Sequence, residues 1–377
     1  MVSQGIRLGR LMGIEIRVSF SWFVIFGLVT VLLATAYFPQ AYPNLPRNEY
    51  LILGFVTSFL FFVSVLLHEL SHSVIARFNH INIRSITLFI FGGVAHMDED
   101  PSTPAAEFLM AVAGPFASII LSGLFAGAYL TAGTLKLGVL FTGPLLYLAI
   151  INIYLAVFNL IPGYPLDGGR VLRAFLWAIT KDIRRATRIA SLMGQAFAML
   201  LIFSGLYMIF VERAFWVNGL WFIFIGIFLQ QVAAAGYEEV VMHLTLSGVK
   251  VKDIMTPDVV TVGAATMVND LVNDYFMRYK HSKFPVVEGG AVIGVVTLQS
   301  IQDVPRDEWD RTRTRAVTPS FDKRAEVLPE MMAEEAIARM TDIHVGYLLV
   351  MEDGDIKGIL TMRDLAGAIQ MRRNLGV

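Results

Sequence analysis

The sequence contains no cysteine among its 377 residues. A disulfide framework, a cysteine-ligated zinc site and a thiol nucleophile are therefore all excluded. Any metal site in this chain must be built from histidine and carboxylate side chains.

Charged residues are also scarce, but only in one part of the chain. Residues 1–237 contain 14 Lys or Arg and 10 Asp or Glu, whereas residues 238–377 contain 16 and 21. The first part carries about one charge per ten residues, against about one in four in an ordinary soluble domain. The overall net charge of −1 provides no basic surface, so no nucleic-acid partner is expected.

Long apolar runs occupy the poorly charged part of the chain. A helix needs about 20 mostly apolar residues to span a bilayer. Lys and Arg are concentrated in the N-terminal segment and after the second and fourth runs, which places both termini in the cytoplasm. We therefore expect an integral, multi-pass protein of a prokaryotic cell membrane. The six predicted spans lie near residues 19–38, 50–76, 106–130, 138–162, 190–210 and 216–236.

A short stretch between the second and third spans differs from the helices around it. Residues 81–95 are rich in β-branched side chains and contain Gly92-Gly93. This pattern predicts an extended strand that ends at the two glycines. The strand either docks at a protein-lined cavity at membrane depth or forms a simple cytoplasmic hairpin.

The second span contains the sequence His68-Glu69-Leu70-Ser71-His72. Positions i and i+4 share one face of a helix, so both imidazoles can reach one Zn²⁺, with Glu69 beside the open coordination position. Polar groups inside a span are costly and indicate function. The alternative is a pair of hydrogen-bonded histidines near a helix end.

A third ligand is expected because a catalytic zinc keeps three protein ligands. Asp167 is the only acidic residue between Glu107 and Asp182. It follows a Pro- and Gly-rich break after the fourth span, so its carboxylate can point back into the helices. His68 lies about 27 Å along its own span from the external side. Asp167 and His68 are therefore predicted at the same depth.

Together these motifs resemble the site-2 protease family of intramembrane zinc metalloproteases. The resemblance covers residues 1–237. It implies cleavage of transmembrane protein substrates in regulated intramembrane proteolysis. The motifs that carry it are His68-Glu69-Leu70-Ser71-His72, Phe91-Gly92-Gly93-Val94-Ala95, Ala113-Gly114-Pro115 and Asn159 with Asp167-Gly168-Gly169-Arg170.

The resemblance also implies a role for individual residues. One Zn²⁺ is bound by His68, His72 and Asp167. Glu69 is the general base and Asn159 positions the substrate. The strand ending at Gly92 and Gly93 is similar to the edge that pairs with an extended substrate in that family. A second asparagine, Asn152, either faces the same cavity or forms a hydrogen bond between helices.

The charged part of the chain contains an internal repeat. Gly294-Val295-Val296-Thr297 recurs as Gly358-Ile359-Leu360-Thr361, and Thr256-Pro257 recurs as Thr318-Pro319. Each copy shows the pattern strand, acidic helix, strand, glycine turn, strand, helix. The repeat resembles a tandem pair of cystathionine-β-synthase (CBS) domains.

The expected fold is therefore a polytopic α-helical membrane protein with six transmembrane helices and a short membrane-associated β-strand region, followed by a soluble α/β tandem CBS domain. The expected domains are a transmembrane zinc metalloprotease domain (1–237), a linker (238–248) and two CBS domains (249–310 and 311–377).

The CBS resemblance implies that an adenine nucleotide such as ATP regulates the protease, and that the CBS domains form a homodimer. Its motif places Thr297, Thr361 and Asp364 at the nucleotide. Ser300 stands where copy one would carry the acid, which weakens that half of the site. Threonine and aspartate at this spacing also form an ordinary helix cap, so both interpretations stay open.

One function of another class fits the same outline. Membrane cores with cytoplasmic CBS pairs also include ion channels and transporters, in which intramembrane His and Asp would line an ion path. Such a protein needs neither a Glu between two histidines at helical spacing nor an Asp at matched depth. The sequence therefore favours the protease.

Overall fold

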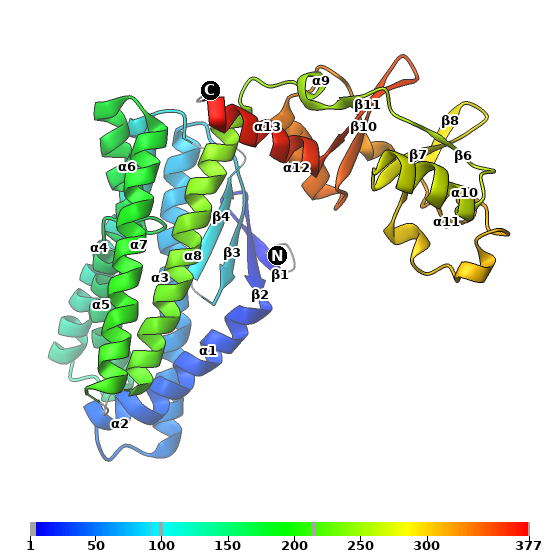
Figure 1. Cartoon of the computed structure of the whole chain (residues 1–377). Coiled ribbons are helices and arrows are strands. Elements are labelled where there is room, and N and C mark those ends of the chain that lie inside the picture. Colours follow the sequence, from blue (N-terminus) through cyan, green and yellow to red (C-terminus); the bar gives the residue numbers. More distant parts are fainter. Residues whose placement is uncertain (1–4, 91, 98–100, 213–215, 376–377) are drawn as a thin grey trace. The chain divides into compact units, whose positions relative to one another are not determined.

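The computed structural model describes residues 5–90, 92–97, 101–212 and 216–375. The chain divides into two compact units, Met1–Val240 and Val241–Val377 (Figure 1). Each unit has its own core, and each is described separately below.

Within the described residues, the first unit contains six helices long and apolar enough to cross a membrane, which confirms the six predicted spans. The fourth span ends at Asn159 rather than at residue 162, because the residue before Pro162 disfavours the helical conformation. The helices are α1 (Phe20–Leu32), extended by a π-helical turn (Leu33–Tyr37) and α2 (Phe38–Ala41), then α3 (Arg47–Phe78), α4 (Pro104–Thr134), α5 (Val139–Asn159), α7 (Ile183–Phe210) and α8 (Trp216–Leu246).

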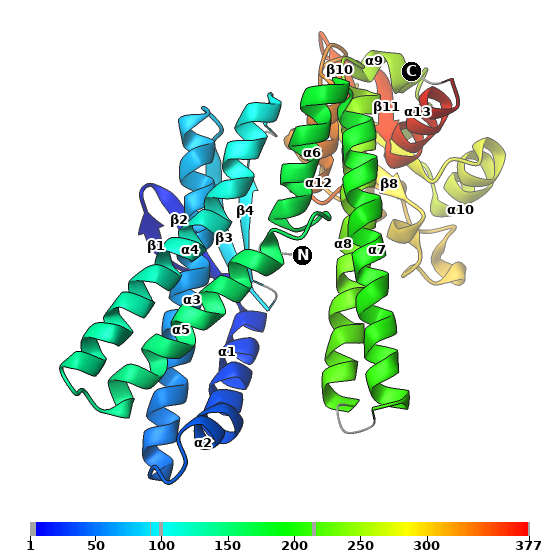
Figure 2. The same ribbon diagram turned by 90° about the vertical axis from the view of Figure 1, so that its left-hand side faces the viewer.

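These helices bury small residues and expose large apolar ones, as expected for helices packed against each other in lipid. On α7, Ala190 and Ala198 are fully buried, whereas Phe203 is 61% exposed. Figure 2 shows α7 and α8 side by side. They approach closely at Gly205 and Gly219, where an added Cβ on either residue would lie about 2.5 Å from the backbone oxygen of the other.

A four-stranded sheet packs against α3. Its strands are β1 (Gly5–Leu11), β2 (Ile14–Ser19), β3 (Ile83–Phe89) and β4 (Gly92–Met97), in the order β1-β2-β3-β4. The pairs β1–β2 and β3–β4 are antiparallel, and β2 runs parallel to β3. Ile14, Ile16 and Val18 of β2 are buried. This alternation fixes which face of the sheet joins the core.

The prediction of a single strand ending at Gly92-Gly93 is wrong. The first strand ends at Phe89, and Gly92 begins β4 with a φ of 133°, a conformation that favours glycine. The segment is therefore a hairpin, and β4 is the edge strand of the sheet.

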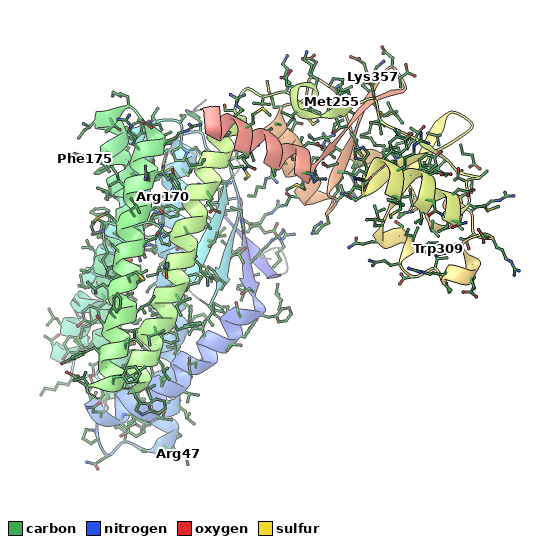
Figure 3. All side chains as sticks on the ribbon, in the orientation of Figure 1. Arg47, Arg170, Phe175, Met255, Trp309 and Lys357 are labelled. Atoms are coloured by element: carbon green, nitrogen blue, oxygen red, sulfur yellow. The ribbon has the colours of Figure 1, made fainter. Side chains whose placement is uncertain are left out.

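One further helix, α6 (Asp167–Thr180), lies between the fourth and fifth spans. No helix was expected here, only a segment rich in Lys and Arg after the fourth span. The helix contacts α4 and α7, and Phe175 points away from them (Figure 3) with 59% of its surface exposed. Asp167 is its first residue, so the helix holds that carboxylate at a fixed place.

The second unit contains two sheets of mixed strand direction, with strand orders β6-β7-β8 and β5-β11-β10-β9. Its elements are α9 (Val251–Ile254), β5 (Thr256–Pro257), β6 (Val262–Gly263), α10 (Val268–Asp270) with a π-helical extension (Leu271–Met277), β7 (Lys283–Glu288), β8 (Ala291–Thr297), α11 (Thr314–Val317), β9 (Glu326–Val327), α12 (Ala333–Asp342), β10 (Tyr347–Glu352), β11 (Asp355–Thr361) and α13 (Met362–Leu375).

The two repeat copies exchange segments. Strand β5, at the start of copy one, pairs with β11 of copy two. In the other direction, the backbone N–H of Thr314 donates to the carbonyl of Thr266 and that of Arg315 to Ala264. Each copy thus pairs with a segment from the start of the other copy.

The helix expected after β8 is absent from copy one, where the described chain forms only a 3₁₀ turn, Gln299–Ile301. Copy two has the full helix α13 at the equivalent place. Pro305 accounts for the difference, because it lacks an N–H and disfavours a helical residue before it.

Candidate metal centre

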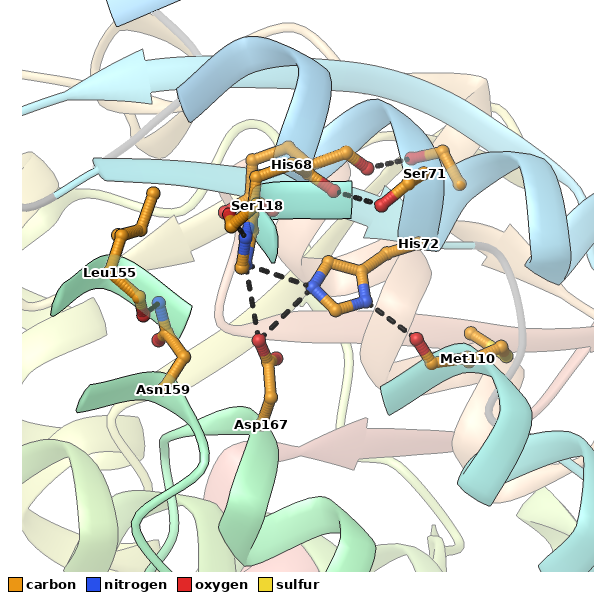
Figure 4. A network of polar contacts seen from close by, with 10 residues as sticks. His68, Ser71, His72, Met110, Ser118, Leu155, Asn159 and Asp167 are labelled. Atoms are coloured by element: carbon orange, nitrogen blue, oxygen red, sulfur yellow. Dashed lines mark hydrogen bonds and ion pairs between the residues drawn. The ribbon is translucent and has the colours of Figure 1, made fainter. Parts of the chain in front are cut away.

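Two buried histidines and one partly buried aspartate meet near the C-terminal end of α3. His68 and His72 are one helical turn apart and are 3% and 7% exposed. Oδ2 of Asp167, the first residue of α6, lies 3.1 Å from Nε2 of His68 and 3.2 Å from Nε2 of His72. The two Nε2 atoms are 3.3 Å apart (Figure 4). The structure therefore brings together three residues that are separated by up to 99 positions in the sequence.

These separations match a tetrahedral zinc site. Ligand atoms placed tetrahedrally about 2.0–2.1 Å from zinc lie about 3.3 Å from one another. All three measured distances are within about 0.2 Å of that value, inside the tolerance expected of a metal site. Two imidazole nitrogens and one carboxylate oxygen are also a donor set that suits a catalytic zinc.

The outer nitrogens of both imidazoles are held by α4. Nδ1 of His72 donates to the backbone carbonyl of Met110 at 2.6 Å, and Nδ1 of His68 lies 2.9 Å from Oγ of Ser118. A carbonyl can only accept, so the proton of His72 is on Nδ1. The Nε2 lone pair is then available to a metal, which is the usual arrangement around histidine ligands. Neither Met110 nor Ser118 was expected at the site from the sequence.

A glycine on α4 makes room for the donor atoms. A Cβ added at Gly114 would lie 2.1 Å from Nε2 of His72 and 2.6 Å from Nε2 of His68. No side chain is tolerated there without displacing the imidazoles. The sequence motif Ala113-Gly114-Pro115 therefore has a local physical reason.

Burial raises the pKa of the Asp167 carboxyl, but the adjacent His72 and His68 rings lower it by more, so its pKa lies below its usual range. An ionised carboxylate is the form that binds a metal.

The donor atoms open onto a cavity of about 570 Å³ within the first unit. Its walls are mostly apolar and come from the spanning helices α1, α3, α4, α5 and α8 and from strands β3 and β4, for example Ile25 of α1, Phe61 of α3 and Trp221 of α8. Its polar lining residues are His68, Glu69, His72, Ser73, Asn159, Asp167 and Arg170. Glu69 therefore lies in the same cavity as the three donors.

Strand β4 forms one side of this cavity and passes close to Glu69. A Cβ added at Gly93 would lie 2.4 Å from Cγ of Glu69, so Gly93 lets the strand approach the carboxylate side chain. Gly92, Val94 and Ala95 line the cavity as well. The interpretation that this segment borders a cavity and the interpretation that it is a hairpin are thus both correct.

The two asparagines of α5 have different surroundings. Asn159 lines the cavity, and its amide donates to the carbonyl of Leu155 in its own helix at 3.0 Å. Asn152 is fully buried and donates to Oγ of Ser64 at 3.3 Å and to the carbonyl of Leu148. Asn152 therefore bonds between helices.

The residues predicted at a nucleotide site lie in the second unit and have the contacts of helix caps. Oδ2 of Asp364 accepts from the backbone N–H of Thr361 at 2.8 Å and from its hydroxyl at 2.6 Å. Oδ1 accepts from the hydroxyl of Thr256 at 3.0 Å. In copy one, Oγ of Ser300 accepts from the N–H of Thr297 at 3.2 Å.

Comparison with known proteins finds a matching family model in each of the two parts of the chain. The model of peptidase family M50 matches residues 56–138 and 132–201, and the CBS domain model matches residues 251–306 and 325–371. A solved structure of a site-2 protease from Methanocaldococcus jannaschii is 28% identical, with a TM-score of 0.43, and the match covers 62% of this chain and 94% of that one.

Two relatives match this chain over almost its whole length. A protein of Mycobacterium tuberculosis named as a candidate zinc metalloprotease, Rip3, is 33% identical over 98% of this chain and 93% of its own. A candidate zinc metalloprotease of Synechocystis is 32% identical over 98% and 96%. These names decide against the channel or transporter alternative. The chain belongs to peptidase family M50, the site-2 protease family, and is a multi-pass membrane zinc metalloprotease with a C-terminal pair of CBS domains.

Proposed function

We propose that this protease hydrolyses peptide bonds within or near the transmembrane segments of membrane-protein substrates, using a zinc ion held by His68, His72 and Asp167. One observation carries the proposal. The three donor atoms and Glu69 meet in an apolar cavity whose walls are membrane-spanning helices. Such a cavity suits an apolar polypeptide segment better than a soluble one.

The residues around the donors have complementary roles in the hydrolysis. When bound, zinc lowers the pKa of water at the site to near 7 and polarises a peptide carbonyl. Glu69 accepts the proton of the attacking water and returns it to the leaving amine nitrogen. The amide of Asn159 has two N–H groups, and the one not donated to Leu155 is available to the carbonyl oxygen of the substrate.

The edge strand β4 orients the substrate. A peptide bond inside a helix is shielded, so the substrate must unwind locally before it can react. An unwound segment that pairs with β4 regains backbone hydrogen bonds by strand addition. Gly92 and Gly93 lie at the start of this strand. The close approach of Gly93 to Glu69 then places the paired segment next to the general base.

Cleavage by full-length protein in liposomes tests this function. The substrate is a single-span polypeptide with a glycine pair in its span and a label at each end. We expect the wild type to cut within or near the span, as located by mass spectrometry. Glu69→Gln should reduce the rate about 10²- to 10⁴-fold with unchanged zinc content, while Glu49→Gln, at the other end of α3, should have no effect. Equal rates for wild type and Glu69→Gln, or cuts only in the soluble tails, would refute the proposal.

We also propose that the CBS pair regulates the protease through an adenine nucleotide. The connection along the chain supports this proposal, because the second unit begins within α8, the helix that contributes Ile225 to the cavity wall. Between these points, Gly236 packs against the ring of Tyr164, where an added Cβ would lie 2.2 Å from Cε1. Tyr164 is three residues from Asp167.

Equilibrium binding of ATP, ADP and AMP to the full-length protein tests the regulatory proposal. Asp364→Ala should weaken binding, because the proposed site uses that carboxylate. Asp355→Ala, at the exposed start of β11, should leave binding unchanged. If the wild type binds none of the three, Asp364 is a helix cap and the regulatory proposal is wrong.

We further propose that both termini are cytoplasmic and that the CBS domains form a homodimer. The distribution of Lys and Arg supports cytoplasmic termini, which protease protection of tagged vesicles would test. Association through the CBS domains would give a homodimer, and the mass of the detergent-solubilised protein distinguishes it from a monomer.

A further inference from the structure

A buried ion pair lies behind the metal centre. Nε and Nη2 of Arg173, on α6, are each 2.5 Å from Oε1 of Glu107, in the first turn of α4. The two side chains are 6% and 1% exposed. Neither residue is part of the cavity lining. The pair is therefore not placed to contact a substrate.

Glu107 belongs to a stripe of α4 that contacts both imidazoles and the helix that begins with Asp167. Glu107, Met110, Gly114 and Ser118 follow one another at intervals of three or four residues, so they share one face of the helix. Met110 and Ser118 hold the two imidazoles, and Gly114 gives them room. Glu107 holds α6, the helix that begins with Asp167.

An ion pair is a costly way to join two helices away from water, because both charges lose their hydration. Apolar side chains would pack the helices without that cost. The pair adds a fixed position of α6 along α4, since a charge-assisted hydrogen bond has a defined geometry. Oε2 of Glu107 has no hydrogen-bond partner among the described residues, so the bond through Oε1 is what fixes this carboxylate.

Register matters because Asp167 is close to Arg173 along the same rigid helix. The two residues are about 9 Å apart along the axis at 1.5 Å per residue. Sliding α6 by one residue would move Asp167 by about 1.5 Å, whereas metal–ligand distances tolerate about 0.2 Å. We infer that Glu107 and Arg173 are positioning residues that hold Asp167 at the distance the metal requires. This inference rests on the ligand set of the proposed function.

Cobalt binding to the full-length, metal-free protein in detergent tests the inference. Co²⁺ is titrated by its visible d–d absorption, which reports both affinity and ligand geometry. Arg173→Met and Glu107→Gln should weaken binding about 10- to 100-fold and alter the spectrum. Arg173→Lys, which keeps the charge, should have a smaller effect. Lys181→Met, which removes an exposed cation at the other end of α6, should change neither quantity.

A double variant separates positioning from general damage to the fold. If Arg173 acts through Asp167, then Arg173→Met should not weaken binding further when Asp167→Ala is already present. Additive losses in the double variant would overturn the inference. Wild-type affinity and spectrum in both Arg173→Lys and Glu107→Gln would overturn it as well. These conservative variants decide the question if Arg173→Met does not fold.

The variant Asp167→Ala distinguishes an error in the proposed ligand set from an error in the positioning role. If Asp167→Ala binds Co²⁺ as the wild type does, the ligand set is wrong and the inference falls with it. If Asp167→Ala binds weakly while the pair variants bind normally, the ligand set stands and only the positioning role is wrong.

Discussion

Residues whose side chains cannot bind a metal also determine the geometry of the candidate metal centre. Gly114 lets α4 approach the two imidazoles, and Gly93 lets β4 approach Glu69. Met110 contributes only its backbone carbonyl. Such contributions are invisible to a search for ligand residue types, because they depend on which backbone comes close to which side chain.

The cluster of His68, His72 and Asp167 was predictable from the sequence. The i, i+4 spacing places His68 and His72 on one face of α3, and the matched depth singles out Asp167. The structure brings all three together. The partners of Ser118 and Arg173 were not predictable, because no motif links these residues to partners that lie 50 and 66 positions away in the sequence. The assignment of Glu69 as base and of Asn159 as a substrate contact stays a prediction.

Two glycine substitutions on α4 test whether the imidazoles of His68 and His72 need the space left by Gly114. Gly114→Ala should lower zinc affinity at least about tenfold, because the new Cβ displaces both imidazoles. Gly123→Ala, nine residues further along α4, meets nothing within 4 Å. It should retain zinc and gain up to about 1 kcal/mol of helix stability. Zinc content after dialysis against a weak chelator compares the two. Equal retention by both variants would contradict the account.

The membrane-spanning helices were the secondary structure that could be predicted from the sequence. The six spans follow from apolar runs, because the backbone must satisfy its own hydrogen bonds in lipid. The β1–β2 hairpin was missed, although Ile14, Ile16 and Val18 alternate as a half-buried strand should. Its signal merges with the apolar run that starts α1. The segment exchange of the CBS copies could not be predicted, because it depends on contacts between distant parts of the sequence.

The N-terminal cap of α4 matters for stability because that helix holds both imidazoles and, through Glu107, α6. Oγ1 of Thr103 accepts from the N–H of Ala106 at 3.2 Å. Thr103→Ala should destabilise the protein by about 1 kcal/mol in thermal unfolding in detergent. Thr131→Ala removes an exposed hydroxyl that bonds within the same helix and should cost less. A larger loss from Thr131→Ala would show that the cap is not the important contact.

At the scale of the whole molecule, a zinc ion held by His68, His72 and Asp167 would join parts of the first unit that are far apart in the sequence. A ligand that binds only the folded state stabilises it by about 2.7 kcal/mol at a free concentration 100 times its Kd. Chelation should therefore lower the unfolding temperature of the membrane unit. Asp167→Ala should remove most of this dependence on zinc. If chelation leaves the wild-type unfolding temperature unchanged, zinc does not join α3 to α6.

Zinc-edge X-ray absorption of the full-length, zinc-loaded protein tests the central claim most directly, because it reports the atoms bound to the metal. The account predicts two imidazole nitrogens together with oxygen donors, and in Asp167→Ala a loss or rearrangement of the oxygen donors. Three or more imidazoles in the wild type, or a spectrum of Asp167→Ala identical to that of the wild type, would contradict the proposed site.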